Sequence, residues 1–142
     1  MGDPRLEALL RALHPGQRLW LRAGGRSLWP LVLDRDQLLV ERGDEAALKR
    51  GEIALVVDDR DRLVAHLVEA LRPLRTVSSV GVVDAPAKEV LGKVVAVRRG
   101  ERTVRLVRGA RHLLKLVPPT ARVFKRVAVL RLFVQLLRDR AR

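Results

Sequence analysis

The stretch Val90–Val107, VLGKVVAVRRGERTVRLV, decides the fold class of this chain. Two valine-rich runs flank the short polar connection Arg99–Glu101, which contains a glycine. β-branched residues favour strands, and such a connection between two strand-like runs is typical of a hairpin. We therefore predict a β-hairpin made of the strands Val90–Arg98 and Arg102–Val107.

Shorter strands of the same kind are predicted on the N-terminal side of this hairpin. Turn signals separate them, among them Gly24-Gly25 and the charged turn Asp58–Arg62. Strands and helices do not alternate, so the pattern does not indicate a Rossmann or P-loop fold. The predicted strands are Gln17–Ala23, Gln37–Glu41, Ile53–Val57, Leu63–Leu71 and Thr76–Val83.

A helix is predicted at each end of this β region. Asp3 can cap the first helix, Pro4–Leu13, and its apolar face carries leucines at helical spacing (Leu6, Leu9, Leu10 and Leu13). The second helix, Ala121–Arg140, follows Pro118-Pro119 and has apolar residues at alternating spacings of four and three. We expect a mainly β fold with a small coiled sheet, organised as residues 1–118 and a basic amphipathic helix in residues 119–142.

The composition limits the kinds of site that the chain can hold. Its 142 residues are 48% hydrophobic and only 3% aromatic, enough for one domain with a core of leucine and valine. There is no cysteine, which excludes disulfides and cysteine-based metal or redox sites. The histidines His14, His66 and His112 lack the spacing of metal ligands, so we expect neither a metal nor a cofactor.

The net charge of +13 is concentrated towards the C-terminus, where residues 110–142 carry +8. No run of eighteen uncharged apolar residues occurs, and the segment Met1–Arg5 does not begin a signal peptide. We therefore expect a cytoplasmic protein. Its terminal helix either docks on the β core or contacts an anionic membrane surface peripherally.

Five segments carry a family resemblance through their residues and their order. The first, Gly25–Pro30 (GRSLWP), places a serine after a glycine turn and before a proline. Of the others, Leu48–Ile53 contains the step Gly-Glu-Ile, and Leu63–Val68 contains the step Val-Ala-His. Over residues 17–108 the order resembles signal peptidase I and the self-cleaving SOS-repressor domains, most closely the small soluble branch of these serine peptidases. The other four segments are Leu38–Glu41, Leu48–Ile53, Leu63–Val68 and Val90–Val97.

The resemblance implies a serine endopeptidase that cleaves a peptide or protein through an acyl-enzyme. Ser27 matches the nucleophile, which needs a neighbouring base to remove its proton. Members of the superfamily use lysine or histidine, and no lysine lies between Lys49 and Lys88, so His66 matches the base. Asp84 lies where the family often has an acid that orients the imidazole.

The chain departs from the family pattern, and each of the three residues has an ordinary structural interpretation. Leu67 stands where an arginine commonly follows the histidine, and Gly81-Val82 stands where Gly-Asp is frequent. Ser27 can be a turn serine, His66 a hydrogen-bonded core histidine and Asp84 a turn acid.

Two other classes of function stay open at this point. One is a binding module on the same fold with an inactive serine site. The other is a binder of nucleic acid or another anionic surface, driven by the positive charge. Because the chain shows no helix-turn-helix, no paired RNA-binding aromatics and no zinc motif, we do not expect nucleic acid as its partner.

Overall fold

The computed structural model describes residues 4–24, 32–78 and 82–107, and these form a mainly β fold. The prediction of a mainly β fold with a short N-terminal helix is thus confirmed, whereas the predicted helix 121–140 lies outside the described residues. Within the described residues the elements are α1 (Pro4–Ala12), β1 (Arg18–Arg22), β2 (Gln37–Arg42), the 3-10 turn η1 (Glu45–Ala47), β3 (Ile53–Val57), β4 (Leu63–Ala70), β5 (Arg75–Val77), β6 (Glu89–Arg99) and β7 (Arg102–Arg105).

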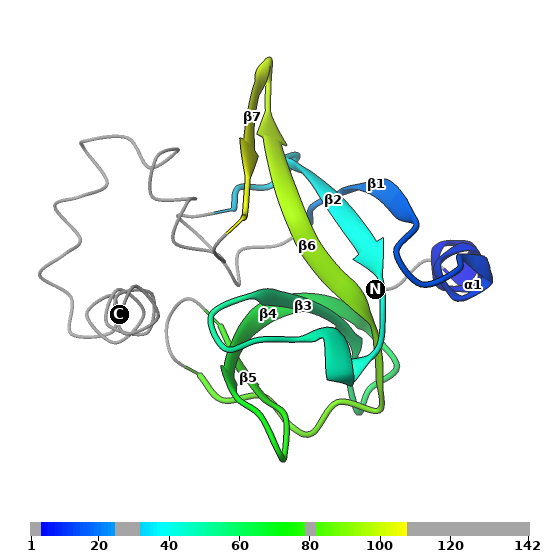
Figure 1. The fold of residues 1–142 in the computed structure, drawn as a ribbon, viewed down its shortest axis with the longest axis vertical. Coiled ribbons are helices and arrows are strands. Elements are labelled where there is room, and N and C mark those ends of the chain that lie inside the picture. Colours follow the sequence, from blue (N-terminus) through cyan, green and yellow to red (C-terminus); the bar gives the residue numbers. More distant parts are fainter. Residues whose placement is uncertain (1–3, 25–31, 79–81, 108–142) are drawn as a thin grey trace, which may run out of the picture.

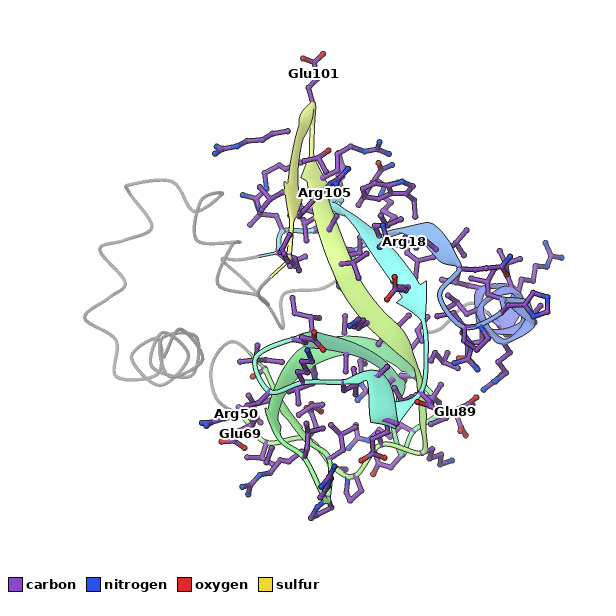
Figure 2. The ribbon with its side chains drawn as sticks, in the orientation of Figure 1. Arg18, Arg50, Glu69, Glu89, Glu101 and Arg105 are labelled. Carbon is purple, nitrogen blue, oxygen red and sulfur yellow. The ribbon has the colours of Figure 1, made fainter. Side chains whose placement is uncertain are left out.

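The long strand β6 is the centre of an antiparallel sheet (Figure 1). One edge of β6 pairs with β2, and the other edge pairs first with β3 and then with β7. The order across the sheet is β1-β2-β6-β3-β4-β5, with β7 beside β6. The predicted hairpin is confirmed as β6–β7, and it projects away from β3, β4 and β5 with Glu101 at its tip (Figure 2).

Two irregularities in pairing occur along β6. The register with β2 shifts by one residue between Leu39 and Val40, and the register with β3 shifts between Leu55 and Val56. Each shift leaves an extra residue on β6, and such bulges bend a strand and increase its twist. The bent strand β6 pairs with β2 and β7 towards one end and with β3 towards the other (Figure 1).

Hydrophobic side chains form two clusters, on opposite faces of β3 and β4. Alternate residues of these strands point to opposite faces, and every residue of β3 is buried. The larger cluster includes Ile53, Leu55 and Leu67 together with Leu10 of α1. The smaller cluster consists of Leu48, Ala54, Val56 and Val68, with partly buried neighbours.

Helix α1 covers part of the larger cluster through Leu6 and Leu10, and Leu13, which directly follows the helix, packs against the same cluster. Leu9, which the sequence places on the apolar face of the helix, is 49% exposed. The part of α1 that contacts the core is therefore narrower than its apolar face. Arg11 fastens the helix to Glu89 at the start of β6, with an Nη2 to Oε2 distance of 2.9 Å.

The predicted strand Thr76–Val83 is wrong in its extent, because β5 ends at Val77. The chain turns back at this point instead of continuing along β4. Ser78 N–H donates to the carbonyl oxygen of Val82, and Val83 forms an isolated bridge with Val77. The two halves of this valine-rich segment therefore pair with each other.

The other predicted strands agree with the structure to within one or two residues at each end.

Among the described residues, no helix is both long and apolar enough to cross a membrane.

Candidate functional site

His66 occupies the middle of β4 and faces the smaller hydrophobic cluster. Its neighbour Leu67 points into the larger cluster, so strand alternation directs the imidazole to the opposite face. Ala54 lies opposite His66 on β3. His66 is 9% exposed. An imidazole in such a place needs a hydrogen-bond partner.

Asp84 supplies this partner from the segment that follows β5. Oδ2 of Asp84 lies 2.5 Å from Nδ1 of His66, although 18 residues separate the two in the chain. The side chain of Asp84 is 21% exposed and that of His66 is 11% exposed. The structure therefore brings two of the three predicted site residues together at the margin of the core.

Thr76 on β5 is a third member of this cluster, and the sequence analysis did not identify it. Its hydroxyl donates to the same Oδ2 of Asp84 at 2.6 Å. Thr76 pairs with Val68, two residues beyond His66, and strand alternation puts Thr76 and His66 on one face of the sheet. The signal was present only in the register of β4 against β5, which the sequence alone does not reveal.

Ser78 is a second hydroxyl residue beside the end of β5 that the sequence analysis did not single out. Leu67–Val77 is the last residue pair between β4 and β5, and Ser78 directly follows Val77 as His66 directly precedes Leu67. Ser78 is 7% exposed. Its oxygen accepts the N–H of Val82 at 3.3 Å, which ties Ser78 to the segment that leads to Asp84.

The contact with Asp84 leaves the second imidazole nitrogen of His66 available. A carboxylate at Nδ1 favours the tautomer that carries its proton there, and this leaves a lone pair on Nε2. Within the described part of the chain, no hydrogen-bond partner of Nε2 is found. The arrangement of carboxylate and imidazole is suited to accepting a proton at Nε2 and holding the resulting positive charge.

Lys93 is a charged residue on the same sheet face as His66. It lies on β6 opposite Ala54, so Lys93, Ala54 and His66 form one row across three neighbouring strands. Nζ of Lys93 lies 3.4 Å from Oε1 of Glu52, which directly precedes β3. The lysine in register with His66 is therefore engaged with a carboxylate and is separated from the imidazole by a strand.

Ser27 belongs to residues 25–31, which lie outside the described residues. The two ends of the connection that contains it are described, and they are held together. Ala23 N–H donates to the carbonyl oxygen of Asp36 at 2.7 Å, and Arg35 N–H donates to that of Ala23 at 3.2 Å. The connection between β1 and β2 is thus closed at its base.

The side chain of Asp36 fastens this base to the β6–β7 hairpin. Asp36 is 3% exposed, and its oxygens accept Nε and Nη2 of Arg99 at 3.0 and 2.8 Å. Oδ2 also accepts the N–H of Leu33 at 2.8 Å. A carboxylate buried to this degree requires such partners, and the two-pronged arginine satisfies both of its oxygens.

The described residues contain no group of three histidine, cysteine or acidic side chains placed to hold a metal ion. Of the other two histidines, His14 lies on the exposed turn after α1, and His112 lies outside the described residues. No protein-family model matches the chain, and no curated protein matches it.

Proposed function

We propose that this protein is a serine endopeptidase similar to signal peptidase I, which cleaves a peptide or protein substrate through an acyl-enzyme on Ser27. His66 acts as the general base and then as the general acid, and Asp84 orients its imidazole. The observation that carries the proposal is the 2.5 Å contact between Nδ1 of His66 and Oδ2 of Asp84. The serine box at Gly25–Pro30 contributes the nucleophile by resemblance.

In the acylation step, Nε2 of His66 takes the proton of the Ser27 hydroxyl while Oγ attacks the scissile carbonyl carbon. The C–N bond then breaks, and the imidazolium returns its proton to the departing amine. In deacylation, His66 takes a proton from water, the resulting hydroxide attacks the ester, and Ser27 leaves with the proton from His66. The Asp84 carboxylate keeps its contact with Nδ1 through both steps and stabilises the transient imidazolium.

The described geometry favours His66 over a lysine as the base. Lys93 is engaged with Glu52, and Ala54 of β3 lies between it and His66 in register. A lysine used as a base must also be deprotonated at neutral pH, which requires a large decrease of its pKa. A histidine is largely neutral under the same conditions.

A fluorophosphonate probe tests this proposal, because it reacts with serines that are activated as nucleophiles. We expect the full-length protein to be labelled at Ser27, as located by peptide mass mapping, and Ser27→Ala to abolish the labelling. His66→Gln should lower the labelling rate by about 10²-fold or more, since the base would be lost. Ser78→Ala is the comparison variant and should keep the labelling, because Ser78 is the serine among the described residues and directly follows β5.

Three results contradict the proposal. Labelling of Ser27→Ala at the parent rate would place the nucleophile elsewhere. A mass shift on Ser78 would assign the chemistry to that residue. A folded parent protein without any labelling would favour the binding module with an inactive serine site.

A further inference from the structure

We propose that Thr76 is a positioning residue of this site, because its hydroxyl fixes the Asp84 carboxylate in the orientation that meets Nδ1 of His66. An effect of Thr76 on catalysis rests on the proposed peptidase function. The geometry that carries it lies wholly within the described residues and can be tested without activity.

Thr76 holds Asp84 at two points. The backbone N–H of Asp84 donates to the carbonyl oxygen of Thr76 at 3.0 Å, and the Thr76 hydroxyl donates to Oδ2 of Asp84 at 2.6 Å. The bridge between Val77 and Val83 lies directly beside these contacts. The backbone hydrogen bond positions the main chain of Asp84, and the side-chain hydrogen bond orients its carboxylate.

The Thr76 hydroxyl is needed to hold the Asp84 carboxylate, because water is an alternative hydrogen-bond partner. The Asp84 side chain is 21% exposed, so water can compete for its oxygens. Both protein donors converge on Oδ2, at 2.6 Å from Thr76 and 2.5 Å from His66. With the Thr76 donor removed, rotation of the carboxylate towards water would no longer break a hydrogen bond to the strand.

Thr76 is well placed to impose an orientation. It is 5% exposed, and as a β-branched residue in a strand it has a restricted χ1 angle. Its pairing with Val68 fixes its position relative to β4, which carries His66. The imidazole and the hydroxyl are therefore positioned by two paired strands, and Thr76 connects Asp84 to them.

Thr76→Val tests the inference, because valine keeps the shape of threonine and removes only the hydroxyl. Thr76→Ser restores a hydroxyl on a smaller side chain, and Thr76→Ala is a second variant without one. Thr103→Val is the matched control, since Thr103 is an exposed threonine of β7 with no described side-chain hydrogen bond. Each is made in the full-length chain.

The main readout is the imidazole NMR spectrum of His66 at alkaline pH, recorded as long-range nitrogen–proton correlations. The chain has only three histidines, so the spectrum of His66→Gln assigns the signals. We expect the parent, Thr76→Ser and Thr103→Val to show the Nδ1–H tautomer. Thr76→Val and Thr76→Ala should show a mixture of tautomers, because Asp84 would no longer be held against Nδ1.

The second readout is the rate of labelling at Ser27. We expect Thr76→Val to lower it by about tenfold, the size expected for one hydrogen bond to a charged group, and Thr76→Ser to restore it. A merely structural role would lower thermal stability and leave the tautomer and the labelling of the folded protein unchanged.

The outcomes separate this inference from the proposed function. An unchanged His66 tautomer in folded Thr76→Val or Thr76→Ala overturns the role of Thr76, whatever the labelling shows. A change of tautomer that Thr76→Ser reverses supports the positioning role. If the parent protein is not labelled, the peptidase proposal fails while the positioning result still stands on the spectra.

Discussion

Gly92 of β6 passes so close to Glu41 of β2 that a Cβ atom on Gly92 would lie 2.3 Å from the Glu41 carbonyl oxygen. The same atom would lie 3.1 Å from Cγ1 of Val40. Gly92 also pairs with Leu55 on β3, so it is held between two strands. The missing side chain allows β2 and β6 to approach each other beside the two bulges of β6.

We expect Gly92→Ala to lower the free energy of unfolding by about 1–3 kcal/mol, the usual cost of forcing extra volume into a packed region. The obstructing atom is a backbone oxygen, which cannot rotate away as a side chain could. Urea unfolding followed by circular dichroism measures the change. The control is Gly24→Ala, since a Cβ at Gly24 meets nothing within 4 Å. Equal stability of the two variants would contradict the prediction.

The turn between β3 and β4 provides a second prediction, centred on Asp58. Its Oδ1 accepts the N–H groups of Arg60 and Arg62, and its Oδ2 accepts Nε of Arg62 at 2.8 Å. Burial acts to raise the pKa of Asp58, but these hydrogen bonds outweigh it and hold the pKa below its ordinary value of 3.8. Asp58→Ala should therefore cost about 1–3 kcal/mol at neutral pH, because turn N–H groups lose their acceptor.

The lowered pKa also gives a pH dependence with a definite sign. The ionised form of Asp58 is favoured by folding, so its contribution is present in full above pH 3.8 and is lost as the pH falls through the lower pKa of the folded state. The stability difference between the parent and Asp58→Asn should shrink on acidification in that range. A difference that stays constant down to complete protonation would show that the charge of Asp58 does not matter.

The ion pair between Asp36 and Arg99 gives a third prediction. Arg99→Met should destabilise the fold by about 3 kcal/mol, because the buried Asp36 carboxylate would lose its charged partner. Arg99→Lys should recover only part of the loss, since an ammonium group cannot bind both oxygens in the two-pronged geometry. Thermal unfolding measures both variants, and full recovery by lysine would contradict this account.

Asp84→Asn gives a fourth prediction that bears on the proposed chemistry. An amide can present its NH₂ group to Nδ1 and so favour the wrong tautomer of His66. We expect the labelling rate at Ser27 to fall by about 10³-fold or more while the fold is kept. Labelling kinetics measure the first effect, and thermal unfolding of the same samples checks that the fold is kept. Labelling at the parent rate would remove Asp84 from the mechanism.

The basic C-terminal segment gives a fifth prediction, which rests on the sequence because residues 108–142 lie outside the described residues. Residues 110–142 carry a net charge of +8, and each basic residue near an anionic membrane contributes about 1 kcal/mol of binding. We expect weak co-sedimentation with phosphatidylserine vesicles that decreases as salt rises. Removal of residues 119–142 should abolish it.

The matched control for this experiment is a neutral phosphatidylcholine vesicle. Binding that does not depend on salt, or that survives the truncation, would exclude the peripheral membrane contact. Unfolding of the truncated protein would show instead that the segment stabilises the β core.

The local elements of this protein follow from short-range patterns in its amino-acid sequence. Valine-rich runs with strand periodicity predicted Ile53–Val57 and the β6–β7 hairpin, because backbone preference and alternation act over neighbouring residues. The charged turn at Asp58–Arg62 was likewise predicted, since an aspartate that accepts nearby N–H groups needs no distant partner. The resemblance named His66 and Asp84 as residues of interest, and their roles stay predictions.

The way in which these elements meet became visible in the folded chain. The end of β5 at Val77, the return of the chain to Asp84 and the contact of Thr76 with Oδ2 all depend on the register of β4 against β5. The central position of β6 depends on bulges and on the close approach at Gly92. Pairing between distant strands is set by the packing of side chains from many parts of the chain at once, and no local window of sequence contains that information.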